Sequence, residues 1–164
     1  MKLSRNLILF MPSIDGGGVE KNLIIIANYL IKKISKLTII TYDARFNSMF
    51  DKKINIVNYK KESKDEKKYY KYFICIILLV KEFLKERKVL VVSFQANIYV
   101  LILSIFLKFR IIIRSNSAPI GWSQNFIKRK IFKFFFQFAD EIIVNSNEFK
   151  RIVDKEFKTN CKVI

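Results

Sequence analysis

Short apolar runs alternate along the chain with longer segments in which apolar residues recur at helical spacing. The apolar runs predict strands at residues 6–11, 37–41, 54–57, 89–93, 110–114, 141–144 and 162–164. The longer segments predict helices at residues 19–33, 72–87, 97–106 and 124–139, and one more helix that starts near Ser146. Strands that are apolar along nearly their whole length need cover on both faces. The pattern therefore predicts a single α/β domain with a doubly wound, mainly parallel, Rossmann-like sheet.

One stretch, residues 89–107, is long enough to cross a bilayer, because it runs for 19 residues without a charge. A membrane span would have to bury the amides of Gln95 and Asn97 in lipid. A strand, a polar turn and a helix account for the same residues without that cost. We therefore favour a strand followed by a helix. The apolar run at residues 7–11 is too short for the core of a signal peptide and also predicts a strand.

In a parallel sheet of this kind, ligands bind where the strands end. The loops at that edge are expected at residues 12–18, 95–97, 115–122 and 145–147. The first of them holds three of the four glycines in the chain, Gly16, Gly17 and Gly18. Glycines at the start of a helix let a ligand approach the backbone, and their N–H groups bind phosphate oxygens. The alternative is a tight turn that binds nothing.

Two common glycine-rich loops do not fit. A phosphate-binding P-loop needs Lys and then Ser or Thr directly after the last glycine, but Val19 follows it here. A dinucleotide fingerprint needs a third glycine where this chain has Lys21. Asp43, after the second predicted strand, could imitate the acid that binds the ribose. A nicotinamide-dependent oxidoreductase therefore remains an alternative, testable by calorimetry with NAD.

Several segments fit another family better. They read IDGGGVEKNL at residues 14–23, NLIIIANYL at 22–30, VVSFQ at 91–95, IRSNSAP at 113–119 and ADEIIVNS at 139–146. In this order and spacing they resemble the N-terminal domain of GT-B glycosyltransferases of family 4. The resemblance covers essentially the whole chain. Two departures are the extra Ser115 between Arg114 and Asn116, and the absence of the cleft His that many members carry.

The resemblance implies two Rossmann-like domains facing each other across a cleft. The N-terminal domain would hold the acceptor, and a C-terminal domain, missing here, would hold the nucleotide-sugar. The whole enzyme would transfer a sugar, with retention of configuration, to a glycan or lipid-linked acceptor, as in polysaccharide biosynthesis. Residues 1–164 would be one domain of it and inactive alone. No cofactor and no metal ion are implied.

The same resemblance gives expected roles to residues in the loops. The donor diphosphate is expected to contact Gly16, Gly17 and Gly18. The acceptor side is expected to be lined by Gln95, Asn97, Arg114 and Asn116. The edge between the domains is expected near Ser146. Structural explanations stay open beside these roles: a surface salt bridge for Arg114, turn formation for Gln95 and Asn97, and a helix cap for Ser146, where the cap is favoured.

The amino-acid composition limits the kinds of catalytic and metal site that the chain can form. The chain has 31 Lys and Arg against 14 Asp and Glu, a formal charge of +17, and no His. The lack of His excludes a Ser-His-Asp triad and a His-bound metal. Because 24 of the basic residues are Lys and the chain is rich in residues with A/T-rich codons, the charge reflects either composition drift or a preference for an anionic surface. Cys75 and Cys161 are expected to be buried, reduced thiols, which fits a cytoplasmic protein.

The predicted helix at residues 124–139 has six Phe, four basic residues and no acid. The basic residues are Lys128, Arg129, Lys130 and Lys133. The stripe expected to face the core is Ile127, Ile131, Phe134, Phe135 and Phe138. Phe132 and Phe136 would then lie beside the basic residues, which suits a helix on an anionic membrane surface, such as the inner face of the cell membrane. An ordinary core helix with solvated lysines fits equally, and a non-catalytic membrane or scaffold module is the alternative to the enzyme. Nothing indicates a nucleic-acid partner.

Overall fold

The structure is a computed structural model that describes residues 3–62, 66–115, 126–157 and 159–163. Seven strands form one sheet: β1 (Leu3–Phe10), β2 (Ile34–Ile40), β3 (Asn55–Val57), β4 (Val89–Ser93), β5 (Arg110–Ser115), β6 (Glu141–Val144) and β7 (Lys162–Val163). The helices are α1 (Gly18–Leu30), the short 3-10 helix η1 (Asn47–Met49), α2 (Lys68–Lys85), α3 (Asn97–Leu107), α5 (Phe126–Phe136) and α6 (Asn147–Phe157). All seven predicted strands are present, which confirms the fold class.

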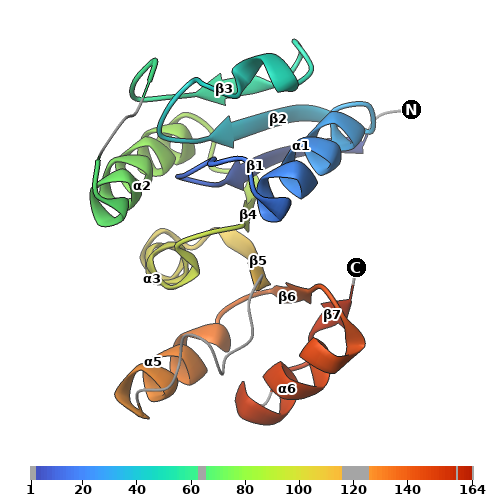
Figure 1. Cartoon of the computed structure of the whole chain (residues 1–164), viewed down its shortest axis with the longest axis vertical. Coiled ribbons are helices and arrows are strands. Elements are labelled where there is room, and N and C mark those ends of the chain that lie inside the picture. Colours follow the sequence, from blue (N-terminus) through green and yellow to red (C-terminus); the bar gives the residue numbers. More distant parts are fainter. Residues whose placement is uncertain (1–2, 63–65, 116–125, 158, 164) are drawn as a thin grey trace.

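All strand pairs are parallel, and the order across the sheet is β3-β2-β1-β4-β5-β6-β7. The chain first moves outward from β1 to β3 and then returns through α2 to β4, on the other side of β1. The strand order therefore reverses between β1 and β4, and a crevice opens at the carboxyl ends of such a pair. In Figure 1, α2, α3 and α5 follow one another along one side of the sheet, and α1 lies on the other.

Two apolar layers hold the sheet and helices together. One joins α2, α3, α5 and α6 to the sheet, and the other joins α1 and the segment around Phe50 to the opposite face. Cys75 and Cys161 are buried free thiols in the first layer, as predicted. Burial raises the pKa of Cys75 to about 12 and that of Cys161 to about 11.

Residues 89–107 fold as β4, a polar turn and α3, which confirms the strand-helix interpretation. Within the described residues, no helix combines the length and apolar character needed to cross a membrane. The largest boundary error concerns α2, which begins at Lys68 rather than at residue 72. Its first turn, Lys-Tyr-Tyr-Lys, carries aromatic side chains that pack onto other rings, and this tertiary packing does not appear in the charge pattern.

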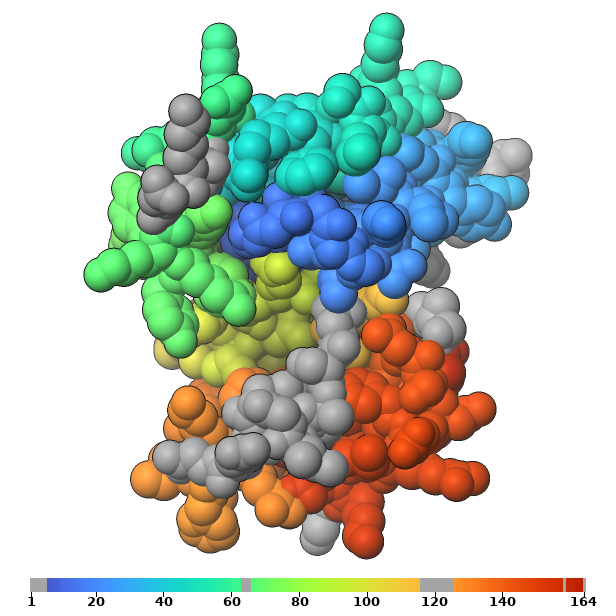
Figure 2. Space-filling model, in the orientation of Figure 1, coloured from blue at the N-terminus to red at the C-terminus, as the bar shows by residue number. Residues whose placement is uncertain are grey.

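Four of the five residues predicted to face the core from α5 are exposed instead, whereas the fifth, Phe135, is half-buried and packs against the core. Ile127, Ile131, Phe134 and Phe138 are 67, 42, 57 and 45% exposed, whereas Phe136 is only 2% exposed. The Phe136 ring packs against Phe157 of α6, with centroids 5.2 Å apart. Because phenylalanines occur around most of this helix, apolar spacing alone does not select the buried face. The contact with α6 selects it. Figure 2 shows α5, in orange, on the same flank as α2, in green.

Candidate functional site

A cavity of about 570 Å³ lies at the carboxyl ends of the central strands. We call it the cleft. Its walls come from the first turns of α1 and α2, the β4–α3 turn, the end of β5 and α5, and they include Lys68, Gln95, Asn97, Arg114 and Lys128. The reversal of strand order between β1 and β4 leaves room here, because neighbouring connections leave the sheet toward opposite faces.

The loop after β1 is fastened to the loop after β4 by one side chain. The backbone N–H of Ser13 donates to Oε1 of Gln95, and Nε2 of Gln95 donates to the carbonyl oxygen of Ser13, both at 3.0 Å. Both ends of the Gln95 amide are therefore used inside the protein. Gln95 lines the cleft, and its amide positions the loop after β1.

The turn between β4 and α3 has a similar internal network. The hydroxyl of Ser93 lies 2.8 Å from Oδ1 of Asn97, and Nδ2 of Asn97 donates to the carbonyl oxygen of Arg114 at 3.0 Å. Ala96, between them, takes a left-handed conformation with φ of 56°. Asn97 thus begins α3 and ties β4 to β5, so the turn-forming explanation considered from the sequence accounts for its hydrogen bonds.

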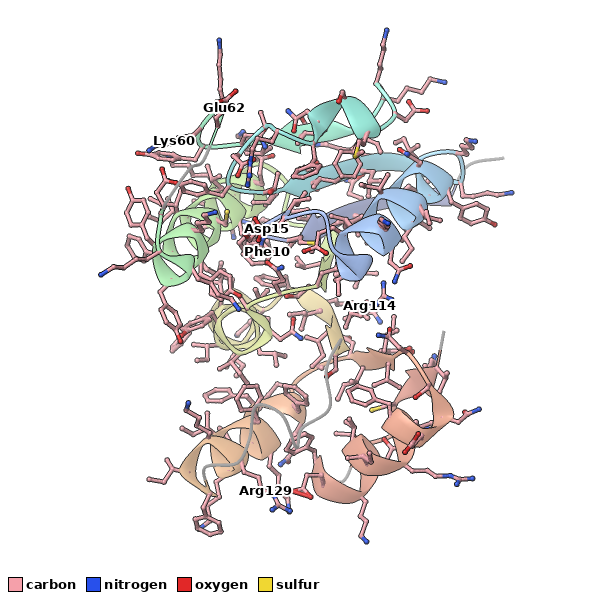
Figure 3. All side chains as sticks on the ribbon, in the orientation of Figure 1. Phe10, Asp15, Lys60, Glu62, Arg114 and Arg129 are labelled. Carbon is pink, nitrogen blue, oxygen red and sulfur yellow. The ribbon has the colours of Figure 1, made fainter. Side chains whose placement is uncertain are left out.

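Arg114 is the buried cation of the cleft. It is 7% exposed, its Nη2 donates to Oδ1 of Asn145 at 3.0 Å, and its guanidinium lies 5.4 Å from the ring centroid of Phe94. Figure 3 shows Arg114 between α1 and the part of the chain that carries β6 and α6. This burial contradicts the surface salt bridge considered for it.

The hydrogen-bonding capacity of Arg114 is incompletely used. Within the described part of the chain, its buried Nε and Nη1 atoms have no hydrogen-bond partner. Burial lowers the pKa of the guanidinium from its usual value, because the charged form loses hydration. A guanidinium remains charged in proteins, so two N–H donors on a buried cation attract an anion or an oxygen-rich ligand.

The three glycines of the loop after β1 have different structural roles. Gly16 has φ of +86°, a left-handed conformation that favours glycine, so the turn explains this residue. A Cβ at Gly17 would lie 2.7 Å from Oε2 of Glu20, a buried acid in the first turn of α1. A Cβ at Gly18 would meet nothing within 4 Å. Only Gly18 therefore offers open space beside a helix N-terminus, and the nearby Glu20 would repel an anion.

The remaining predicted site residues fall into separate groups. The hydroxyl of Ser146 accepts a hydrogen bond from the N–H of Phe149 at 3.1 Å, which confirms the helix cap. Asn116 lies outside the described residues. Lys128 lines the cleft, Arg129 pairs with Glu156 of α6, and Nζ of Lys130 lies 4.5 Å from the ring centroid of Phe126. Lys133 is half-buried. The described residues contain no group of three or more Cys, Asp or Glu placed to hold a metal ion.

Comparison with known proteins bears on the fold. The sequence matches no protein-family model and no curated protein. Among solved structures, the chain superposes on Glycyrrhiza uralensis UGT73P12 in complex with glycyrrhetinic acid 3-O-monoglucuronide, with a TM-score of 0.70 and 11% identity over 98% of this chain and 49% of that one. Anabaena Alr3699/HepE in complex with UDP gives 0.68 and 16%, over 97% and 43%. The lipopolysaccharide outer core galactosyltransferase WaaB gives 0.55 and 12%, over 97% and 44%.

The chain has the fold of one GT-B glycosyltransferase domain. It spans about half the length of the solved structures it matches. At these identities the likeness establishes the fold, and the chemistry has to be argued from the cleft.

Sequence reasoning missed part of the wall of the cleft in this GT-B domain. Lys68, Tyr69 and Tyr72 come from the first turns of α2, and Tyr99 comes from α3. The helix predicted from the apolar pattern begins only at residue 72, so Lys68 and Tyr69 were not placed on a helix beside the sheet. The signal that could have found them is the close run of Tyr69, Tyr70 and Tyr72, which is unusual for a solvated linker.

Proposed function

We propose that this chain is the acceptor-binding N-terminal domain of a retaining glycosyltransferase similar to family 4. It works with a second domain that binds a nucleotide-sugar, and alone it does not transfer sugar. The whole enzyme passes the sugar to a glycan or lipid-linked acceptor in polysaccharide biosynthesis. The observation that carries this proposal is the cleft at the strand-order reversal. There the buried Nε and Nη1 atoms of Arg114 have no hydrogen-bond partner among the described residues, and the fold is that of half a GT-B enzyme.

The residues of the cleft divide the work. Gln95 and Asn97 hold the loops in place through their own hydrogen bonds. Arg114 and Lys128 supply positive charge to the acceptor or to the leaving phosphate. Gly18 leaves room for the donor diphosphate at the open side of α1, where Glu20 limits how closely an anion approaches. Ser146 caps α6 at the edge that faces the second domain.

The reading frame after residue 164 is the first test. A second Rossmann-like unit that carries two glutamates with seven residues between them supports the proposal. The decisive assay then uses the whole enzyme with labelled nucleotide-sugar and compares Arg114→Met with Lys36→Met, a control at an exposed lysine on β2. We expect at least a tenfold loss of transfer for Arg114→Met and no loss for the control. Robust transfer by residues 1–164 alone would refute the division of labour.

A second role, contact with an anionic membrane, is favoured by α5. Its exposed apolar stripe consists of Ile127, Ile131 and Phe134, and the exposed ring of Phe138, just after the helix, packs against Phe134. At 100° per residue, Lys128 and Lys130 flank this stripe on its two sides, and Arg129 is on the side of α6, where it pairs with Glu156. An apolar stripe bordered by lysines suits a helix that lies on anionic lipid, which would place the protein at the cytoplasmic face of a membrane.

Vesicle sedimentation tests the membrane role. We expect the chain to bind anionic vesicles more strongly than neutral ones, and Phe134→Ser with Ile131→Ser to reduce that binding. Ile25→Ser is the matched control, because Ile25 is 66% exposed on α1. Equal binding to neutral and anionic vesicles would count against Lys128 and Lys130 as lipid contacts.

A further inference from the structure

A second cavity, of about 300 Å³, opens between α2 and α3. We call it the groove. Aromatic and aliphatic side chains line it, including Phe73 and Ile76 of α2 and Leu103 and Phe106 of α3, and its described lining contains no charged residue. The two helices are neighbours on one side of the sheet (Figure 1). The lining of the groove therefore suits an apolar group.

The groove and the cleft lie side by side and share part of their walls. Tyr69, Tyr72 and Tyr99 line both cavities. The ring of Tyr72 lies edge-on to those of Tyr69 and Tyr99, with centroids 6.3 and 6.2 Å apart. A tyrosine has an apolar ring and a polar hydroxyl, so these three residues suit a boundary between an apolar compartment and a polar one.

The rim of the groove is unusually exposed. Phe106 is 78% exposed, Phe73 is 63% exposed, and Tyr69 and Tyr99 are 71 and 48% exposed. A contiguous patch of large, exposed apolar side chains marks a binding site more often than scattered single residues do. A ligand chain that lay in the groove would remove much of this area from water.

The charged side chains that line the cleft are mainly positive. Lys68, Arg114 and Lys128 line the cleft, and Glu20 is the one acid among its described lining residues. Nζ of Lys68 also lies 5.6 Å from the ring centroid of Tyr72, which places this cation at the boundary between the two cavities. A ligand that filled both cavities would have an anionic head and an apolar tail.

We propose that the acceptor is lipid-linked, with a phosphate-type head group in the cleft and its aliphatic chain in the groove between α2 and α3. That this ligand is a sugar acceptor rests on the proposed glycosyltransferase function. The two cavities and the chemistry of their walls do not depend on that function. This assignment selects the lipid-linked class over a free glycan, because a free glycan would leave the groove and its exposed aromatic rim unused. An apolar helix of a partner protein would cover the rim without needing the cations of the cleft.

Calorimetry with alkyl phosphates, below their micelle-forming concentrations, tests this on the 164-residue chain. We expect the dissociation constant to fall by about three- to fourfold for each methylene that enters the groove between hexyl and decyl phosphate. Phe73→Ser should weaken decyl phosphate by about five- to tenfold, because it removes an aromatic wall. Leu84→Ser is the control, because Leu84 is 58% exposed on the same helix and lies outside the groove.

The head group is tested separately. Lys128→Ala should weaken decyl phosphate, whereas Lys36→Ala, at an exposed site on β2, should not. Decyltrimethylammonium, with the same tail and a cationic head, should bind at least tenfold more weakly. Affinity that ignored chain length, or equal effects of Phe73→Ser and Leu84→Ser, would overturn the groove assignment. Equal affinity for the cationic amphiphile would indicate a docking surface for an apolar helix instead.

These outcomes separate this inference from the proposed function. If the 164-residue chain binds alkyl phosphate but the complete enzyme transfers no sugar, the groove assignment stands and the glycosyltransferase proposal is refuted. Transfer to a free glycan as efficient as transfer to the same glycan on a lipid would refute the groove as an acceptor site and leave the glycosyltransferase standing.

Discussion

The orientation of α5 decides where Lys128 points and which side chains could meet a membrane, so it is the first feature to test. The two informative substitutions are Phe136→Ala and Phe134→Ala, two residues apart on one helix. Phe136 is 2% exposed and contacts the rings of Phe132 and Phe157, with centroids 5.6 and 5.2 Å away. Phe134 is 57% exposed. The sequence pattern alone predicts the opposite ranking.

The magnitudes follow from buried area. A phenylalanine that buries about 200 Å² contributes roughly 5 kcal/mol at about 25 cal/mol per Å². Allowing for the retained Cβ, Phe136→Ala should lower the free energy of unfolding by about 3–5 kcal/mol. Phe134 buries less than half of its area, so the free energy of unfolding lost in Phe134→Ala is about 2 kcal/mol at most. Because the unfolded chain is compact and already buries part of this area, we expect a loss of about 1 kcal/mol.

Urea unfolding followed by circular dichroism measures both values. With a slope of about 2 kcal/mol per M, Phe136→Ala should lower the midpoint by roughly 2 M and Phe134→Ala by about 0.5 M. Unchanged slopes are the control that both variants unfold as the parent does. A loss for Phe134→Ala equal to or larger than that for Phe136→Ala would refute the observed orientation of α5 and the membrane stripe derived from it.

Three further expectations concern single residues. Gln95→Leu should cost about 1–3 kcal/mol of unfolding free energy, because it leaves the backbone N–H and carbonyl of Ser13 without partners; a cost within experimental error would show that the tie between the two loops is not structural. Arg114→Met should change unfolding free energy by less than about 1 kcal/mol, because the variant also avoids burying a cation; a loss above about 3 kcal/mol would mean that the guanidinium is mainly structural. Cys75 and Cys161, whose pKa values are raised to about 12 and about 11, should resist iodoacetamide at pH 8 in the folded chain and react in urea, as mass spectrometry would show. The stability that these neutral thiols contribute should be lost as pH rises from 9 toward those values, because their folded pKa lies above the unfolded one.

The sequence was sufficient for the sheet, because β4 and β5 are short apolar runs followed by polar residues, a pattern typical of strands in a parallel sheet. It failed at α5, where Phe132, Phe134 and Phe136 offer apolar side chains in several directions and packing against α3 and α6 decides between them. Spacing along one helix carries no information about a partner helix that forms later in the chain.

The cleft lies at the edge of the sheet where the sequence predicted a site, but the hydrogen bonds inside it were not predicted. The rule for parallel sheets pointed to this edge, and Gln95, Asn97 and Arg114 line the cleft there. The bond between Gln95 and Ser13 joins residues 82 positions apart, and no local pattern reveals it. The groove could not be predicted from the sequence for a related reason. Its walls come from both α2 and α3, and neither helix alone indicates a cavity.

The reciprocal bonds between Gln95 and Ser13 act as an extra rung beyond the last backbone pair of β1 and β4. The position of the loop after β1 beside Gln95 is therefore set before any ligand arrives. A ligand that enters the cleft would not have to order this loop, so the entropy of ordering it would not oppose association. We expect binding to be governed by desolvation of the ligand and of Arg114, with little change in the hydrogen exchange of residues 11–15 between the free and bound protein.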